Sequence, residues 1–373
     1  MAVLCQTLMR IVEELAPVRL AEQWDNVGLL VGDPQERVNG VIVALDFNHE
    51  VLEEALEKGA DFIVVHHPPI FHPLKRLTAG GPEGKLLLQA IRQGVHVYAA
   101  HTNLDKVTGG VSDQLAEVLG LTAVEPLSST VREPHYKLVV FVPETHEYQV
   151  RKAIGDAGAG FIGNYSHCTF RAPGTGTFLP QSGANPFLGQ VGEMEEAAEF
   201  RLETIVPKRL LSAVIDAMLK AHPYEEVAYD VYPLAVEGPV QGGLGRVGNL
   251  EKPLDEGRLI QLVKESLHLS HLKVVPGSHA IIQRVAVCGG SGGSLVEAAC
   301  QKGAQALITG DVDYHEGQLA HSLGLMVIDA GHGPTERVVL PWLQQQLEQA
   351  LTLRKEALPV FASQVNTDPW CFY

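Results

Sequence analysis

The sequence predicts an α/β main domain in two halves, with mostly parallel sheets, interrupted by a smaller inserted domain. Its 373 residues exceed the roughly 250 to 300 residues at which single hydrophobic cores stop growing, so we expect two domains. Near both ends of the chain, continuous apolar runs alternate with helical segments, as in parallel sheets that are covered on both faces. The middle of the chain follows a different order of strands and helices.

The first half of the main domain is expected to span residues 1–129. Its start, MAVLCQTLMRIVEELAPVRL, mixes charged and apolar residues in an amphipathic pattern that predicts a helix rather than a signal peptide. The elements predicted beyond it are a strand in VIVALD at 41–46, a helix near 49–59, a strand in FIVV at 62–65, a helix near 84–93 and a strand in VHVYAAH at 95–101.

The second half of the main domain is expected to span residues 237–373, and the same alternation returns there. The predicted elements are a strand in RVAVCGG at 284–290, a helix near 294–302, a strand in ALITGD at 306–311, a helix near 315–322, a strand in MVIDAGH at 326–332 and a long helix at 336–353. Both ends of the chain therefore predict one type of architecture.

Residues 130–236 are expected to form the inserted domain. The predicted elements are a strand at 136–143, a helix near 147–157, strands at 167–173 and 195–207, a helix at 208–221 and a strand at 227–234. This βαββαβ order is the ferredoxin-like pattern, which can bury its two helices against its own sheet and so fold as an insertion. The Gly- and Pro-rich stretch at 173–192 is interpreted as a long loop between the two central strands.

Composition excludes several classes of protein. With 46% hydrophobic and 19% charged residues the chain is an ordinary globular sequence, and its net charge of −16 makes nucleic acid an unlikely partner. Five cysteines without CxxC spacing indicate neither a disulfide framework nor a thiolate zinc site, which favours a reducing cytoplasm. No stretch approaches the roughly 18 apolar residues that would span a bilayer, so we expect a soluble protein without a membrane partner.

Polar residues that follow the predicted strands form a chemically consistent set. Ligands of open α/β sheets bind beyond the carboxyl ends of the strands, and neutral imidazole is the commonest metal ligand. The residues at these ends are His66 and His67 after FIVV, His101, Asn103 and Asp105 after VYAA, Asp311 after ALIT, and His332 and Glu336 after MVIDAG. Four strands thus deliver imidazoles and carboxylates to one edge, which favours a metal site.

Each group taken alone has a simpler interpretation. The histidine pair could be a polar loop, HTNLD a turn stabilised by its Asn and Asp side chains, and the four-residue spacing of His332 and Glu336 the start of a helix at Pro334. Together, three imidazoles and two carboxylates exceed what one tetrahedral zinc ion needs, so two metal ions are plausible. Without cysteine ligands, Zn, Mn, Fe, Co and Ni all stay open. Such a site could activate water for hydrolysis.

Other segments could supply catalytic or substrate-binding residues. His101, Asp311 and His315 are candidates for a base or an outer partner of the metals, although Asp311 or Asp313 could instead cap a helix. In GGSGG at 289–293, Gly289, Gly290 and Gly292 could cradle a phosphate group or simply allow a tight turn.

Two further motifs have structural and functional interpretations. Trp24, Asp25 and Asn26 in WDNVGLLVGD could form a turn or the rim of a substrate pocket. The motif HPYEE at 222–226 could end a helix of the insert or contact the main domain.

The combination of motifs resembles one family across essentially the whole chain. The motifs are WDNVGLLVG, HHPPIF, HTNLD, HPYEE, GGSGGS, TGDVDYH and DAGHGPTE, and the family is that of the YqfO/YbgI or Nif-three-like proteins, commonly labelled GTP cyclohydrolase 1 type 2 homologs. The resemblance implies a dinuclear metal site, an inserted domain similar to PII and CutA, and hexameric rings of identical chains. It also maps the family's metal ligands onto His66, His67, Asp105, His332 and Glu336.

Two classes of function remain open. The first is a metal-dependent hydrolase that acts on a nucleotide or on another small phosphorylated or cyclic amide substrate. The second is a non-catalytic regulator or a metal-delivery protein. The resemblance is weaker on activity than on fold, because the chain lacks the cysteine and histidine zinc arrangement of the type 1 cyclohydrolase.

Overall fold

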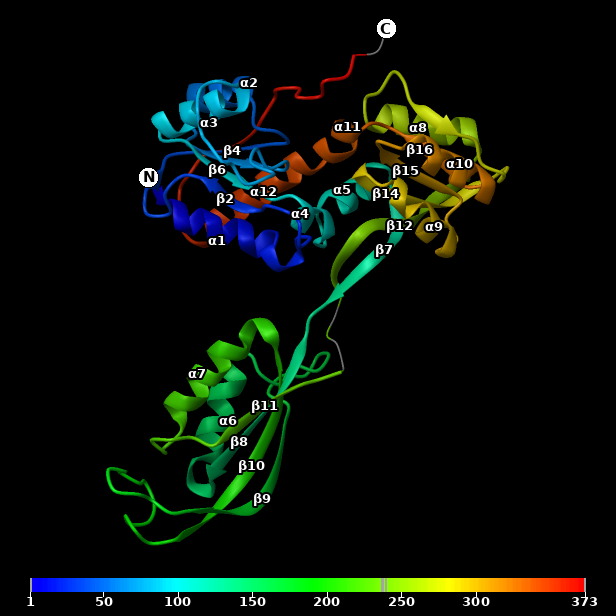
Figure 1. The fold of residues 1–373 in the computed structure, drawn as a ribbon. Helices are drawn as coiled ribbons and strands as arrows, with labels where there is room; N and C mark the ends of the chain where they lie inside the picture. The colour runs from blue at the N-terminus through cyan, green and yellow to red at the C-terminus, as the bar shows by residue number, and fades with distance from the viewer. Residues whose placement is uncertain (1, 236–237, 239, 372–373) are drawn as a thin grey trace. The chain divides into compact units, whose positions relative to one another are not determined.

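The computed structural model describes residues 2–235, 238 and 240–371. The chain divides into two compact units (Figure 1). The main unit comprises Met1–Val131 and Gln241–Tyr373, and the inserted unit comprises Arg132–Val240. Among the described residues, no helix is both long and apolar enough to cross a membrane.

The first sheet of the main unit has the strand order β17-β4-β5-β6-β2. Its strands are β2 (Gly28–Val31), β4 (Val41–Ala44), β5 (Phe62–Val65), β6 (His96–Ala99) and β17 (Val360–Ala362). Neighbours from β17 to β6 are parallel, and only β2 runs antiparallel to its neighbour. The prediction of a mostly parallel sheet is therefore correct for this sheet.

Helices cover both faces of this sheet, which explains the continuous apolar runs of its strands. Helices α1 (Cys5–Leu15) and α12 (Val339–Leu353) pack on one face with Val41 and Val43. Helices α2 (His49–Glu57) and α3 (Pro82–Arg92) pack on the other with Ile42 and Ala44. Each fully buried Val or Ile contributes about 1.5–3 kcal/mol, so this core anchors the strand ends firmly. Short strands β1 (Val3–Leu4) and β3 (Arg37–Val38) pair beside it.

The second sheet has the order β13-β16-β15-β14-β12-β7. Its strands are β7 (Leu121–Arg132), β12 (Val240–Leu254), β13 (Lys273–Val275), β14 (Ile282–Ser291), β15 (Ala306–Gly310) and β16 (Met326–Asp329). Strands β14, β15 and β16 are parallel to one another, while β12 is antiparallel to β14 and β13 is antiparallel to β16. The prediction of a mostly parallel sheet is wrong here, because the sequence patterns of β7, β12 and β13 were not recognised as strands.

Helices also cover both faces of the second sheet. The helices are α5 (Val111–Val118) and α8 (Glu256–Ser266) on one face and α9 (Val296–Gln301) and α10 (Tyr314–Leu323) on the other. The long helix predicted at 336–353 is two helices, α11 (His332–Arg337) and α12, and α12 packs with β17 on the first sheet. Helix α12 and strand β17 thus belong to the half in which the chain begins (Figure 1).

The inserted unit is a sheet with two helices on one face. Its elements are β8 (His135–Pro143), α6 (Glu147–Asp156), β9 (Thr169–Phe178), β10 (Glu195–Pro207), α7 (Leu211–Ala221) and β11 (Tyr229–Pro233). The strand order is β11-β8-β10-β9, and every pair is antiparallel. Both helices pack on apolar residues such as Leu138 and Leu202.

Two predicted boundaries in this unit differ from the structure. A 3-10 turn at Lys208–Leu210 precedes α7, so the helix begins later than predicted. Strand β9 continues to Phe178, so the loop predicted at 173–192 is wrong over its first residues. Pro173 pairs with Phe200, and β9 tolerates this proline because it is an edge strand, where a missing N–H can face away from the ladder.

Deleting residues 132–240 and joining the remaining ends through a short Gly/Ser linker should leave a soluble main unit. Strands β7 and β12 are neighbours in the second sheet, so the linker need not cross the core. We expect an α/β circular dichroism spectrum and a single cooperative thermal transition, with the full chain as control. Insoluble protein at every linker length would show that the main unit needs the insert to fold.

Candidate metal centre

A cluster of imidazoles and carboxylates lies where strands of both main-unit sheets end. His66 and His67 follow β5, and Asp105 lies on the short helix α4 (Thr102–Lys106) after β6. His332 and Glu336 lie on α11, after β16. Three overlapping groups have ligand atoms within 4.8 Å of one another: His66, His67 and His101; His67, His332 and Glu336; and His66, Asp105 and Glu336. The fold therefore brings the five predicted ligands and His101 together.

Three of these imidazoles are oriented in the same way. In each ring, Nδ1 contacts a protein acceptor. The contacts are Ala100 O at 2.9 Å from His66, Asp46 Oδ1 at 2.8 Å from His67 and Asp311 Oδ2 at 2.7 Å from His332. Because a carbonyl oxygen only accepts, Nδ1 of His66 carries the proton, and the lone pair of the neutral ring is on Nε2. Metal-ligating histidines are commonly held by such outer acceptors.

The Nε2 atoms point to the buried carboxylate of Glu336. The distances are 2.9 Å from His67 Nε2 to Oε2, 3.2 Å from His332 Nε2 to Oε1 and 3.5 Å from His66 Nε2 to Oε1. Burial would raise the pKa of Glu336, but the surrounding imidazoles outweigh it and hold that pKa well below its usual value. Glu336 is therefore an anion at the centre of the cluster.

Among the described residues, two buried polar atoms of the cluster, His66 Nε2 and Asp105 Oδ1, have no hydrogen-bond partner, and a third, Glu336 Oε2, lies 2.9 Å from His67 Nε2. Asp105 Oδ1 lies 3.5 Å from His66 Nε2, and burial raises the pKa of Asp105 to about 6. Leaving such atoms unsatisfied costs about 1–3 kcal/mol each. A nitrogen lone pair and two carboxylate oxygens that meet in one buried place fit a cation, so the residues present suit a metal ion.

Metal binding at neutral pH should release protons from His67 and His332. Burial lowers the pKa of His67, but hydrogen bonds with Asp46 and Glu336 raise it to about 10. The hydrogen bond with Glu336 raises the pKa of His332 to about 9 against burial. Both rings are thus protonated in the metal-free protein below about pH 9, and an ion must displace these protons. Affinity should fall as pH falls and level off above about pH 10.

Calorimetric titration of the metal-free protein in two buffers of different ionisation enthalpy measures this release. Equal heats in both buffers at pH 7 would contradict it. On metal binding, the His67→Gln variant should release fewer protons than the unchanged protein, because one of the two protonated rings is missing. The difference between the two proteins is the internal comparison.

His101 has its own carboxylate partner. Its Nδ1 lies 2.8 Å from Asp25 Oδ1, and Asp25 Oδ2 accepts a hydrogen bond of 3.0 Å from the backbone N–H of Thr102. Burial and the neighbouring His66 lower the pKa of His101, so the ring is neutral at pH 7. The candidate His101 is therefore available as a base or as a further ligand.

The other residues of the 24–26 segment have different roles. The side chain of Trp24 is 61% exposed, and its ring lies 6.3 Å from that of His101, which puts it at the rim of the cluster. Asn26 donates to the backbone carbonyl of Ile70 at 2.5 Å and so holds the loop in place. Asn26 thus has a structural role, and the proximity of Trp24 to His101 is compatible with the prediction of a pocket rim.

Asp311 and His315 differ in their relation to the cluster. Asp311 holds His332 from a left-handed backbone conformation, φ 52°, which an Asp tolerates better than most residues. The residue that caps α10 is Asp313, which accepts from the N–H of Glu316 at 2.7 Å. His315 is exposed on α10 and belongs to none of the clusters found among the described residues. The structure thus gives no support to His315 as a catalytic residue.

The glycines of the 289–293 motif allow close contacts with neighbouring elements. The N–H groups of Gly289 and Gly290 donate to Ser112 Oγ at 3.4 Å and Thr335 Oγ1 at 3.0 Å, so they are not free to bind an anion. Gly290 has φ +64°, and a Cβ there would lie 2.2 Å from Glu336 Oε1. A Cβ at Gly292 would lie 2.4 Å from Thr309 Oγ1. Of the two interpretations of the motif, these contacts favour the tight turn, and the absence of a Cβ at Gly290 allows Glu336 to approach β14.

The sequence analysis missed Asp46 and Thr367. Asp46 follows β4 just as His66 follows β5, so the strand-end rule would have included it. Its other carboxylate oxygen accepts a hydrogen bond from Thr367 near the end of the chain. No motif around Thr367 indicated this role.

Comparisons with known proteins extend over almost the whole chain. Residues 3–369 match the family model described as Duf34/NIF3 (NGG1p interacting factor 3). Proteins named GTP cyclohydrolase 1 type 2 homolog from Bacillus subtilis (strain 168) and Halalkalibacterium halodurans are 42% and 44% identical to the chain over 367 residues, with 98% of each chain covered. The solved structure of a Bacillus cereus protein related to NIF3 matches with a TM-score of 0.91 and 44% identity, over 100% of this chain and 99% of that one.

Proposed function

The chain belongs to the Duf34/NIF3 family, and on that premise we propose that its cluster holds two divalent metal ions for hydrolysis of a nucleotide or another small phosphorylated or cyclic amide substrate. The proposed ligands are His66, His67, Asp105, His332 and Glu336. The observation that carries the proposal is the shared orientation of three imidazoles whose Nε2 atoms converge on a buried carboxylate.

Two ions are proposed because Glu336 belongs to two groups. One consists of Glu336 with His67 and His332, and the other of Glu336 with His66 and Asp105. Glu336 is common to both groups, and a carboxylate with two oxygens suits a shared ligand. Imidazole and carboxylate donors without a thiolate suit Zn, Mn, Fe, Co or Ni.

When bound, ions of this kind lower the pKa of water toward neutrality and polarise substrate oxygens. The chain's own contribution to proton transfer is His101, a neutral ring 5.2 Å from that of His66, with Nδ1 held by Asp25. Trp24 and Phe71 lie 5.8 Å apart at the rim, both exposed, and supply an apolar surface for a planar ring such as a nucleobase.

A second candidate function is metal delivery. The side chains of His67 and His332 are 25% and 34% exposed, whereas that of His66 is 1% exposed. Ions held on the exposed side could exchange without unfolding of the protein. Exchange that is independent of any substrate favours this function over hydrolysis.

The test of the proposed function combines metal content with turnover. Protein reconstituted with Zn, Mn, Fe, Co or Ni is analysed for metal and assayed with GTP and a panel of nucleotides and small phosphorylated or cyclic amide compounds. We expect about two ions per chain and turnover that His101→Asn reduces without loss of metal. Less than half an equivalent of metal would reject the centre, and full metal content without turnover or nucleotide-induced stabilisation would leave metal delivery as the better function.

Asp46→Asn should weaken metal binding by about 10–100-fold, because outer partners of ligating histidines have effects of this size. The carboxylate lies 2.8 Å from Nδ1 of His67 and favours the ring orientation that directs Nε2 to Glu336. Competition with a chromophoric chelator measures the affinity. Asp216→Asn, an exposed position on α7 of the insert, is the control. Equal affinities in the two variants would exclude Asp46 from the centre.

We also propose that the inserted unit is a ferredoxin-like domain. Its βαββαβ order, its antiparallel sheet with β8 and β10 in the centre and its two helices on one face support this.

A further inference from the structure

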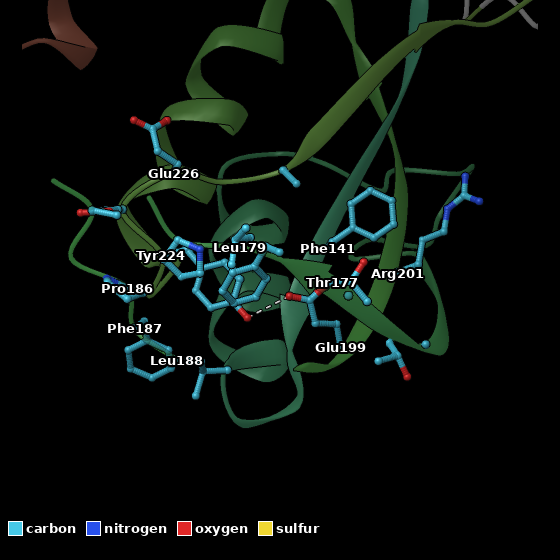
Figure 2. Close-up of a pocket in the computed structure, with 18 of the residues that line it drawn as sticks. Phe141, Thr177, Leu179, Pro186, Phe187, Leu188, Glu199, Arg201, Tyr224 and Glu226 are labelled. Carbon is cyan, nitrogen blue, oxygen red and sulfur yellow. Dashed lines mark hydrogen bonds between the residues drawn. The ribbon is translucent and has the colours of Figure 1, made fainter. Parts of the chain in front are cut away.

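The inserted unit contains a cavity of about 740 Å³ on the sheet face that its helices leave uncovered. Its floor comes from β8, β9 and β10, and its walls come from residues 179–188 and 224–228 (Figure 2). This volume is within the range of small-molecule sites, about 300–1,000 Å³. The cavity is formed within one unit and shares no residue with the metal centre.

Strand alternation explains why this face is hollow. On β10, Leu202 faces the helices, so Glu199 and Arg201 face the other side of the sheet. On the neighbouring strand, Gly174 lies opposite Glu199, and Gly176 lies two residues further along. Because these glycines have no side chains, the floor is low and the space above it stays open.

Aromatic rings line one side of the cavity. The rings of Phe178 and Phe187 lie 6.0 Å and 6.1 Å from that of Tyr224. Figure 2 shows Phe187 and Tyr224 on the same side of the cavity, and Leu179 also lines it. Ring faces attract cations within about 6 Å, and the attraction is stronger where water is excluded.

Glu199 supplies a buried negative charge. The residue is 7% exposed, and one of its oxygens accepts a hydrogen bond of 2.8 Å from the hydroxyl of Tyr224 (Figure 2). Among the described residues, no lysine or arginine forms an ion pair with Glu199. Arg201, which also lines the cavity, pairs with Glu203 at 3.1 Å and extends away from Tyr224. A buried carboxylate without a positive partner is costly, and a bound cation would remove that cost.

We propose that this cavity binds a small organic cation, an ammonium group on an apolar body. The charged group lies against Glu199 and the aromatic rings, and the apolar body contacts side chains such as Phe141 and Leu179. Glu225 and Glu226 at the rim add further negative charge, which favours a cation over an anion. The site is independent of the proposed hydrolase function.

The test uses the full-length protein and three probes with one body and different head groups: 4-phenylbutylammonium, 4-phenylbutan-1-ol and 4-phenylbutyrate. Ligand-detected NMR and calorimetry measure the dissociation constants. We expect the ammonium to bind at least about tenfold more tightly than the alcohol, and the carboxylate to bind most weakly, because a charge-assisted hydrogen bond is about twice as strong as a neutral one.

Three substitutions test separately how Glu199, Gly176 and Phe187 contribute to binding. Glu199→Gln should weaken ammonium binding at least about tenfold and leave the alcohol unchanged, whereas Glu196→Gln, exposed on the same strand and outside the cavity, should change neither. Gly176→Ala should also weaken binding, because its Cβ would lie 2.2 Å from Glu199 Oε2. Phe187→Leu should weaken the ammonium more than the alcohol.

Four results would overturn the proposal. The first is that none of the probes binds, and the second is that the ammonium and the alcohol bind equally well. The third is that ammonium binding is unchanged in Glu199→Gln. The fourth is that ammonium binding is lost in Asp105→Ala, which would place the probe at the candidate metal centre instead. If sedimentation shows that Glu199→Gln changes the oligomeric state while no probe binds, the face is covered by a second copy of the chain and not by a ligand.

Discussion

Glu336→Gln should lose most of the bound metal and reduce any turnover by at least about 1,000-fold. When several residues of a site act as a unit, removing one of them can cost nearly as much activity as removing all of them. Glu336 is the carboxylate that lies near all three inward-pointing imidazoles, at 2.9 to 3.5 Å. Glutamine keeps the shape but has no negative charge to share between two ions. We expect metal content to fall below half an equivalent per chain by elemental analysis.

The metal-free Glu336→Gln protein should also show lower pKa values for His67 and His332, because Glu336 helps to raise both. NMR titration of the imidazole protons measures this effect without any metal or substrate. Glu297→Gln, at an exposed position in the first turn of α9, is the control. Full metal content in the Glu336 variant would remove this residue from the centre.

Arg246→Met should destabilise the protein by about 3–5 kcal/mol, the effect expected when one partner of a buried ion pair is removed. Arg246 is 2% exposed on β12, and its Nε and Nη2 donate to Asp113 Oδ1 at 2.8 Å and Oδ2 at 2.7 Å. Its Nη1 donates to the carbonyls of Gly243 and Gly245. Without the guanidinium, these carbonyls lose the guanidinium donor, and the Asp113 carboxylate loses two hydrogen bonds and keeps the one from the backbone N–H of Gly109 at 2.7 Å.

Urea unfolding followed by circular dichroism measures this destabilisation. Arg258→Met, with a side chain that is 76% exposed, is the matched control and should change the unfolding free energy by less than about 1 kcal/mol. The double variant Arg246→Met with Asp113→Leu should recover part of the loss, because apolar residues can replace a buried ion pair. An Arg246→Met protein as stable as its control would show that this ion pair contributes nothing net.

The positions of the clustered residues could be predicted because parallel strands direct their carboxyl ends to one edge. His66, His101 and Asp311 each follow a parallel strand, and the sequence shows both the strand and the polar residue after it. What the sequence does not show is the outer partner of each ring. Asp46 and Asp311 differ little from other polar residues at strand ends. Their pairing with His67 and His332 depends on which strands are neighbours, β4 with β5 and β15 with β16, and on the side-chain conformations at those strand ends.

The long strand β12 could not be predicted, because its glycines hide the pattern. Residues 240–249 read VQGGLGRVGN, which lacks the alternation of apolar residues that indicates a strand. The structure explains two of these glycines by close backbone approach. A Cβ at Gly242 would lie 1.9 Å from Lys106 O, and one at Gly248 would lie 2.9 Å from Thr122 O. Such contacts link residues far apart in the sequence, so their cause is tertiary.

The insertion of residues 132–240 between the two halves of the main unit fixes the order in which the centre can assemble on the ribosome. His66, His67 and Asp105 emerge first, and more than 200 residues of chain separate Asp105 from His332. During that interval, the early side chains have no Glu336 to pair with. Chains that stop early, or that are cut within the insert and lose their second half, therefore carry an incomplete set of ligands. Under the proposed metal-binding function, the metal content of a preparation would therefore depend on the fraction of chains that were completed and correctly folded.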